Sequence, residues 1–307
     1  MNLTDTKKIQ TFNTEEFVER FMEPELKTNK VVKNDYGRFF IVRIQDMIKV
    51  SKVPVPPTRA LSHTVMYLTA GEATMKVGSQ LFIVKKNQCL FVPAGQVFSY
   101  DKYEVNEGFL CNFYDDTIIG KLTNNELVKE FEFLAIWGNP LVVVDDHRDK
   151  YVKQTLERIY DEYSANELRN INIIQSYFIA FLHEINASYQ TLLVHAQPSS
   201  IILTNNFKEF LFKFIREKHL VSDYASLLNI SPNHLNKVIK ATTGKSPSRW
   251  IDESIVLESK VLLYQTSLSI NEVAAELGIY DQSYFSRLFK KLEGISPVKF
   301  RQMIEIS

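Results

Sequence analysis

The sequence predicts an α+β protein of two domains, with an N-terminal β-barrel or sandwich, a helical hairpin, and an all-helical C-terminal domain. Three observations predict this fold. The chain has 307 residues, about two domains at roughly 150 residues each. Short apolar runs separated by turn residues fill its first half. Its last third repeats itself at a fixed spacing, which predicts a duplicated unit.

The composition is that of a folded protein and excludes several classes. Apolar residues make up 45% of the chain and aromatic residues 12%, enough to fill two cores. No apolar run approaches the ~18 residues that cross a bilayer, and the first residues lack the apolar core of a signal peptide. We therefore expect a cytoplasmic protein without a membrane partner. The two cysteines, Cys89 and Cys111, form no C-x-x-C pair, so we expect small core residues rather than disulfides or zinc ligands.

The N-terminal domain is expected over residues 1–145. From about residue 38 to 115, runs rich in valine and aromatic residues alternate with turns every 8 to 12 residues, as in a small antiparallel sandwich or barrel. Side chains that could face its interior are aromatic or apolar, and they either line a cavity or fill a packed core. These inward candidates are Tyr67, Met75, Phe82, Phe91, Phe98, Phe109 and Phe113.

A helical hairpin is expected over residues 146–194, with a break at 164–170 between its arms. Each arm carries an apolar stripe, and such a stripe packs either on the β domain or on a second copy of the chain. The stripes alone leave intramolecular packing and dimerisation both open. The polar residues 195–200, HAQPSS, read as a linker before the C-terminal domain at 201–307.

The duplication places similar residues 50 positions apart. Leu235 corresponds to Phe285, and Lys240 to Lys290; the Gly-x-Ser-Pro segments at 244–247 and 294–297 also match. Each copy reads as a short helix, a tight turn and a second helix. Pro232 follows Ser231 at the expected start of the second helix in copy one, and a glycine ends that helix in both copies. The pattern predicts two helix-turn-helix units.

Polar and basic residues cover the face of each second helix that lies opposite its apolar stripe. Such groups read base edges or neutralise phosphates, and helix-turn-helix proteins place this helix in the major groove. A solvated helical face is the alternative reading for one such helix, and the repetition favours DNA. The candidate residues are Asn233, His234, Asn236, Lys237, Lys240, Gln282, Ser283, Tyr284, Ser286, Arg287, Lys290 and Lys291.

Residues 247–266 read as one uninterrupted helix between the two units. Twenty helical residues span about 30 Å, close to the ~34 Å repeat of a DNA helical turn. One chain could thus present both second helices to successive major grooves. The acid-free basic segments 231–245 and 282–292 agree with this interpretation, although the residues from 201 onward contain only 14 basic and 11 acidic residues.

The segment GIYDQSYFSRLFKKLEGISPVKFR resembles the signature of the AraC/XylS family of bacterial transcription regulators, and NISPNHLNKVIKATTGKSPSRWI is similar to that family's first unit. The resemblance covers about 100 residues. It implies base contacts from one set of side chains and phosphate contacts from another, with Tyr284 left as core or groove wall. Base contacts are implied for Asn233, Asn236, Lys237, Gln282, Ser283, Ser286 and Arg287, and phosphate contacts for Lys240, Lys290 and Lys291. The family implies an operator DNA, a small-molecule effector, a homodimer and RNA polymerase as partners, and the resemblance favours the hairpin at 146–194 as the dimerisation element.

The stretch LFIVKKNQCLFVPAGQVFSY resembles a cupin-type sensor domain. Cupin enzymes hold a metal with several histidines and a glutamate, whereas here His63 stands alone and Phe98 occupies the place of a ligand histidine. We therefore expect no metal or cofactor and no enzyme, and we expect His63 at the surface or in a turn. A metal-dependent cupin enzyme with a helical interaction tail is the alternative function. A DNA-repair methyl acceptor would need a reactive cysteine, for which Cys89 and Cys111 lack the neighbours.

Overall fold

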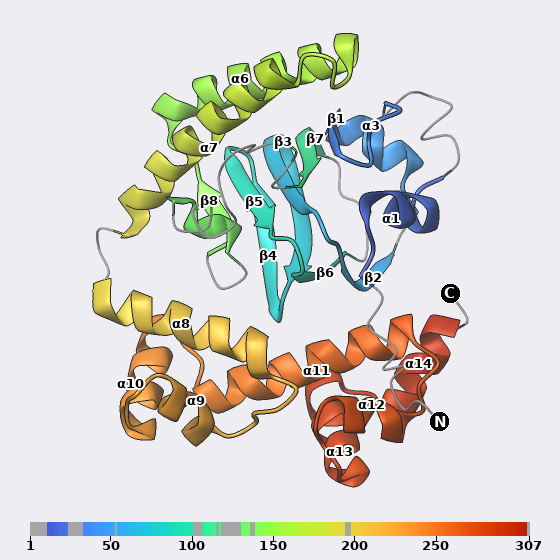
Figure 1. Cartoon of the computed structure of the whole chain (residues 1–307), viewed down its shortest axis with the longest axis vertical. Helices are drawn as coiled ribbons and strands as arrows, with labels where there is room; N and C mark the ends of the chain where they lie inside the picture. The colour runs from blue at the N-terminus through green and yellow to red at the C-terminus, as the bar shows by residue number, and fades with distance from the viewer. Residues whose placement is uncertain are drawn as a thin grey trace, which may run out of the picture. The chain divides into compact units, whose positions relative to one another are not determined.

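The computed structural model describes residues 11–23, 33–52, 54–100, 106–114, 117, 130–135, 139–193 and 198–305. The chain divides into two compact units, Phe12–Pro198 and Ser199–Ser307. The first unit contains an antiparallel sheet with helices, and the second is helical (Figure 1). The α+β architecture expected from the sequence is confirmed at this level.

Helix α1 (Thr14–Phe21) opens the described part of the first unit, in which eight strands follow. Helix α1 starts with a capping box, in which the Asn13 side chain accepts from the Glu16 amide and the Glu16 carboxylate accepts from the Asn13 amide. Between β1 and β2 lie helix α3 (Ile44–Met47) and the 3₁₀ turn η1 (Ile48–Val50). The strands are β1 (Phe39–Arg43), β2 (Val55–Arg59), β3 (His63–Val77), β4 (Gln80–Lys85), β5 (Gln88–Val92), β6 (Val97–Tyr100), β7 (Asn106–Phe113) and β8 (Leu141–Val143).

Strand β3 is 15 residues long and belongs to both parts of the sheet. Its first half pairs with β5 and β7 in the strand order β1-β7-β3-β5-β8, and its second half pairs with β4 and β6. The pairing shifts register between Leu68 and Ala70, where the strand passes from one part to the other. Among the described strands, β1 and β8 end the order without pairing with each other, so the sheet is not a closed barrel.

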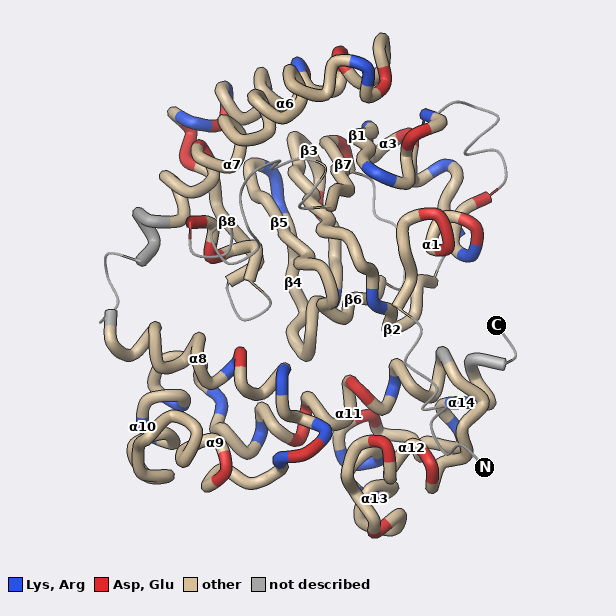
Figure 2. The backbone as a smooth tube through the Cα atoms, in the orientation of Figure 1, with Lys and Arg blue, Asp and Glu red and all other residues tan. Residues whose placement is uncertain are grey.

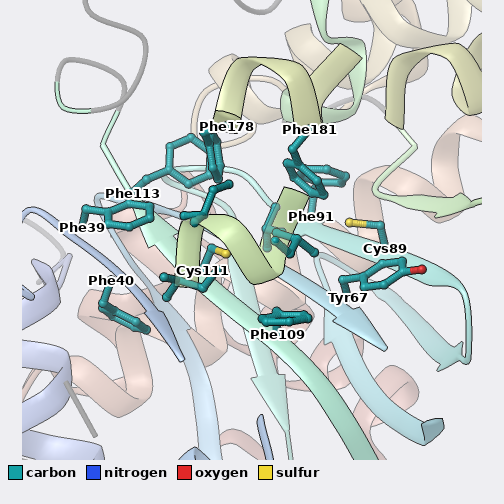
Figure 3. Packing of buried hydrophobic residues seen from close by; sticks show 14 of the residues in the cluster. Phe39, Phe40, Tyr67, Cys89, Phe91, Phe109, Cys111, Phe113, Phe178 and Phe181 are labelled. Carbon is teal, nitrogen blue, oxygen red and sulfur yellow. The ribbon is translucent and has the colours of Figure 1, made fainter. Parts of the chain in front are cut away.

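The outer face of the first part of the sheet forms the core with the helical hairpin. Ile41, Cys111, Val65 and Phe91 are partners across four neighbouring strands, and all are buried in one cluster with residues of the hairpin. Figure 3 shows aromatic side chains of the hairpin helix α7, Phe178 and Phe181, beside the aromatic residues of the strands. The hydrophobic effect acting on this cluster holds helices and sheet together.

The inward candidates of the sequence divide between two faces of the sheet. Side chains alternate along a strand, so neighbouring residues point to opposite faces. Tyr67, Phe91, Phe109 and Phe113 belong to the helix-facing core and are not among the residues that line the cavity described below, and Phe82 is only half-buried. Met75 and Phe98 do line a cavity inside the unit.

The hairpin consists of α6 (Asp146–Asn166) and α7 (Ile171–Leu193). Its break is shorter than expected and covers residues 167–170. Glu162 organises this end, because its carboxylate accepts hydrogen bonds from Arg158, Asn166 and Asn170 at 2.7–2.8 Å. The apolar stripes pack in the core with the sheet, so any dimer interface on the hairpin would use its outer faces. These stripe residues are Val152, Leu156, Ile159, Tyr163, Ile174, Phe178, Phe181, Leu182 and Ile185.

His63 is buried and starts β3, which corrects the expectation of a surface or turn histidine. Its ring stacks on Phe113 at 5.1 Å between centroids, and its Nδ1 accepts a hydrogen bond from the Ala94 amide. Packing and this hydrogen bond explain how a histidine is accommodated at this buried position. In the described parts of the chain, no three His, Cys, Asp or Glu side chains come together as metal ligands would.

The second unit contains seven helices within the described residues. Helix α8 begins at Pro198, so residues 198–200 of the expected linker are helical, while residues 195–197 lie outside the described part of the chain. One hydrophobic cluster holds all seven helices together. They are α8 (Pro198–Phe214), α9 (Val221–Leu227), α10 (Pro232–Thr243), α11 (Pro247–Gln265), α12 (Ile270–Glu276), α13 (Gln282–Glu293) and α14 (Pro297–Glu305).

Candidate nucleic-acid interface

The first candidate reading helix, α10, is fixed at both ends by its sequence. Ser231 accepts a hydrogen bond from the His234 amide at the N-terminus, Pro232 occupies the first turn, and Gly244 closes the C-terminus in the left-handed conformation, with φ of 73°. Leu235 and Ile239 are fully buried. The opposite face is therefore turned away from the core.

The second candidate helix, α13, repeats this arrangement with different residues. Asp281 accepts from the amides of Ser283 and Tyr284, and Gly294 ends the helix with φ of 78°. Its buried side comprises Phe285, Leu288 and Phe289. Both helices thus begin and end where the duplication predicts.

Each candidate helix follows a short helix and a tight turn. Helix α9 precedes α10, and α12 precedes α13. Helix α12 begins with a capping box of Ser269 and Glu272. Helix α9 begins at Val221, and the Asp223 carboxylate accepts from the Leu220 amide. The carboxylate of the third helical residue, Asp223, therefore caps the amide at the start of the helix, where no serine stands.

Helix α11 connects the two helix-turn-helix units and contributes to the core of both. It packs against α9 and α10 as well as α12, α13 and α14. In Figure 1 α9 and α10 lie beside the left end of α11, and α12 and α13 lie below its middle and right part. The helix has 19 residues, so it is about 28 Å long at 1.5 Å per residue. Both candidate helices are therefore packed against a single helical support.

The twelve residues named from the sequence gather on these two helices. Ten of them are exposed, and Asn236 and Ser286 are half-buried. The Asn236 amide donates to the Pro232 carbonyl at 3.0 Å, so its amide group lies against its own helix. The exposed ten are Asn233, His234, Lys237, Lys240, Gln282, Ser283, Tyr284, Arg287, Lys290 and Lys291.

Basic residues next to α10 are neutralised within the unit. Glu253 on α11 accepts from the Lys245 ammonium at 2.8 Å and from Arg249 Nε at 2.6 Å. The ammonium of Lys245 also lies 5.4 Å from the centre of the Trp250 ring. Figure 2 shows acidic and basic residues mixed along α8 and α11. The basic side chains of α10 and α13 are therefore more available to a phosphate than those of α11.

An acid that the sequence analysis did not single out lies beside α13. Burial raises the pKa of Asp252 on α11, while the nearby cations Lys291 and Arg249 lower it. Burial, and then the charge of Asp252, raise the pKa of Tyr284. Tyr284 is 46% exposed, so its ring lies at the edge of the core and can also form part of a groove wall. No spacing in the sequence indicated Asp252, because the contact depends on how α11 and α13 pack.

Neither cysteine has the setting of a reactive thiol. Cys89 and Cys111 lie on neighbouring rows of the sheet, and both are fully buried. Burial raises the pKa of both thiols, so both remain protonated near neutral pH. They pack as small core residues, as the sequence predicted.

The sequence is similar to known helix-turn-helix proteins. Residues 224–303 match the helix-turn-helix domain family. An uncharacterised helix-turn-helix-type transcriptional regulator of Bacillus subtilis is 26% identical over 62% of this chain, and the match spans only 66% of that protein. The arabinose operon regulatory protein of Salmonella typhimurium is 28% identical over 75% of this chain and 80% of that protein. The C-terminal domain of a Geobacillus stearothermophilus response regulator, AraT, is 29% identical over 36% of this chain and 88% of that one, with a TM-score of 0.32.

The search for membrane-spanning helices gave no candidate. Among the described residues, no helix combines the length and the apolar character that a bilayer crossing requires.

Proposed function

We propose that this chain, whose C-terminal domain is an AraC-type helix-turn-helix domain, is a sequence-specific DNA-binding transcription regulator. The resemblance seen in the sequence is confirmed by the match over residues 224–303 and by relatives that are transcription regulators. One observation carries the proposal: α10 and α13 each turn a polar, basic and exposed face away from a core that they share through α11.

The two faces supply different kinds of contact. Arg287 can donate two parallel hydrogen bonds to a guanine, and Gln282 and Asn233 can each pair with an adenine edge. Lys240, Lys290 and Lys291 lie toward the C-terminal ends of the helices, where a long ammonium side chain meets phosphate. The double unit would then contact two successive major grooves, with Ser283 and Ser286 adding further base contacts on α13.

The first unit is proposed as the sensor. Its antiparallel sheet lines a cavity, and the cupin-like resemblance of its sequence supports a sensing role. We propose that it binds a small-molecule effector, that the protein acts as a cytoplasmic homodimer through the hairpin's outer faces, and that RNA polymerase is a further partner. Exposed aromatic residues on those faces, Tyr151 and Tyr177, support the dimer.

The proposal is tested by selecting bound fragments from the host's own genomic DNA and measuring the affinity of the full chain for the recovered sequence. Affinity should fall by orders of magnitude between 50 and 200 mM salt, with a slope near −0.9 per phosphate neutralised. A chain that recovers no common sequence would contradict sequence-specific binding.

Arg287→Ala sharpens the test. Loss of a bidentate base contact should cost about 1–3 kcal/mol and relax the preference at one base pair. Arg169→Ala is the matched control, because it removes the same charge from an exposed position in the other unit. If Arg287→Ala and Arg169→Ala bound the selected site equally well, the role assigned to Arg287 would be wrong.

A further inference from the structure

A cavity of about 110 Å³ lies inside the first unit. Both parts of the sheet line it, together with α1 and α3, so its walls belong to one compact unit. A cavity of about 150 Å³ is large enough to hold benzene. At about 110 Å³ this cavity is smaller, so the part of a ligand that it holds is at most about one small ring.

The strand register explains why the cavity lies on this face. Asn112 on β7 is the partner of Phe40 on β1 and of Thr64 on β3, and Thr64 is the partner of Val92 on β5. All four side chains line the cavity. The next row along the strands points to the opposite face and packs in the hairpin core. The cavity is thus built into the pleat and does not result from one missing side chain.

The lining is uncharged. Of the described residues that form it, none is Asp, Glu, Lys, Arg or His, and most are apolar, such as Met66, Met75, Phe98 and Leu110. A charged ligand would lose its hydration without gaining a counter-ion, which is costly. A sugar would have to place hydroxyl groups against the apolar majority of the wall. The chemistry of the walls selects neutral, largely apolar molecules.

One end of the cavity is polar. The Asn112 amide donates to Ser62 Oγ at 2.9 Å and to Thr64 Oγ1 at 3.1 Å, and its oxygen accepts from Thr14 Oγ1 at 2.9 Å. Both amide protons of Asn112 are thereby used. The hydroxyl groups of Ser62 and Thr64 accept from the amide, so their own protons can be donated to a ligand oxygen. Asn112 holds these hydroxyl groups in place from a buried position.

We propose that this cavity is the effector site of the sensor unit and that it takes a small, uncharged, largely apolar molecule with one oxygen at the Asn112 end. The regulatory role of the cavity rests on the proposed function. The binding site itself is argued only from the residues that line the cavity and from the strand register. Thr64 and Ser62 provide the hydrogen bonds, and the methionine and phenylalanine side chains provide the apolar contact.

The test uses the full chain and four ring compounds of equal heavy-atom number at millimolar concentration. Phenol and toluene differ by a hydroxyl against a methyl group, and cyclohexanol and cyclohexylammonium differ in charge. Binding is measured by calorimetry and by the rise in melting temperature that a ligand specific to the folded state produces. We expect phenol and cyclohexanol to bind, toluene to bind more weakly than phenol, and cyclohexylammonium and the pentose arabinose to bind at least about tenfold more weakly than cyclohexanol.

Two variants locate the site. Asn112→Leu should weaken phenol binding about tenfold, the effect of roughly 1.4 kcal/mol, while changing toluene binding little. Ala73→Leu should abolish the binding of both, because it adds three carbon atoms to the cavity wall. Ala70→Leu, on the same strand outside the cavity, is the matched control and should bind like wild type. Leu110→Phe fills the cavity from the opposite wall if Ala73→Leu does not fold.

Three results would overturn the proposal: tighter binding of cyclohexylammonium or arabinose than of cyclohexanol, no binding of any neutral ring compound, or wild-type affinity in both filled variants. Operator affinity measured with and without phenol separates this inference from the proposed function. Phenol binding in the cavity without any change in operator affinity would leave the site intact and remove the sensing role from the proposed function.

Discussion

Asn229 and Gly278 occupy equivalent turns of the two helix-turn-helix units, and both adopt the left-handed backbone, with φ of 54° and 69°. The amide after each residue returns to the same helical carbonyl: Ile230 donates to Ala225, and Ile279 donates to Ala274, at 3.0 and 2.9 Å. This is the hydrogen bond of a Schellman helix end. The two turns thus have the same left-handed backbone geometry with two different residue types.

Gly278→Ala should destabilise the C-terminal unit more than a left-handed backbone alone explains. A Cβ at Gly278 would lie 2.4 Å from the Arg216 carbonyl oxygen, whereas one at Gly244, with φ of 73°, would meet nothing within 4 Å. Gly244→Ala is therefore the control and should cost about 1–2 kcal/mol of unfolding free energy, and Gly278→Ala distinctly more. Urea unfolding followed by Trp250 fluorescence, in a chain with Trp137→Phe, measures both. Equal losses would show that the close approach relaxes without cost.

Glu253→Gln should increase the affinity for DNA without regard to sequence. The change releases the Lys245 and Arg249 side chains from their shared carboxylate, so they become available to phosphate. We expect the salt dependence of binding to steepen by about 1–2 in its log–log slope. Glu217→Gln, an exposed change of the same charge in this unit, is the control. A steeper slope in both variants alike would assign the effect to net charge only.

Lys290→Ala should weaken the binding of all DNA sequences to a similar degree. Lys290 is exposed in the last turn of α13, so a phosphate contact is expected from it rather than a base contact. The salt slope should become shallower by about 0.9, with the base preference unchanged. Lys299→Ala on α14 removes an exposed charge of the same kind for comparison. A changed preference at one base pair would instead assign Lys290 to base recognition.

Acid should remove the contribution of Glu162 to the stability of the hairpin. Hydrogen bonds from Asn170, then Arg158 and Asn166, lower the pKa of Glu162 from 4.5 to about 2. The ionised form is favoured by folding, so its contribution is complete above about pH 4.5 and is lost as the pH falls toward 2. Glu162→Gln should melt at a lower temperature than wild type at pH 7, with the difference shrinking between pH 4.5 and 2. A difference independent of pH would contradict the role of the charge.

The C-terminal unit could be read from the sequence because local signals decide it. Ser231, Gly244 and Asp281 fix helix ends through bonds to residues a few positions away, and the duplication shows each signal twice. The N-terminal sheet could be predicted only as a class. Whether Tyr67 faces the helices or the cavity depends on register, and β3 changes partners within its length. His63 was misplaced because its stacking partner, Phe113, is 50 positions away in the sequence.

Helix α11 constrains how the two helix-turn-helix units could have diverged. Trp250 and Ile251 near its start and Leu262 and Leu263 near its end belong to one continuous core, so neither half folds around a surface of its own. Replacing one helix-turn-helix unit with that of a related protein would leave mismatched side chains against α11, the helix that both units share. Recombination that preserves folding must therefore cut outside Ser199–Ser307, and new operator preferences would arise by substitution on the exposed faces.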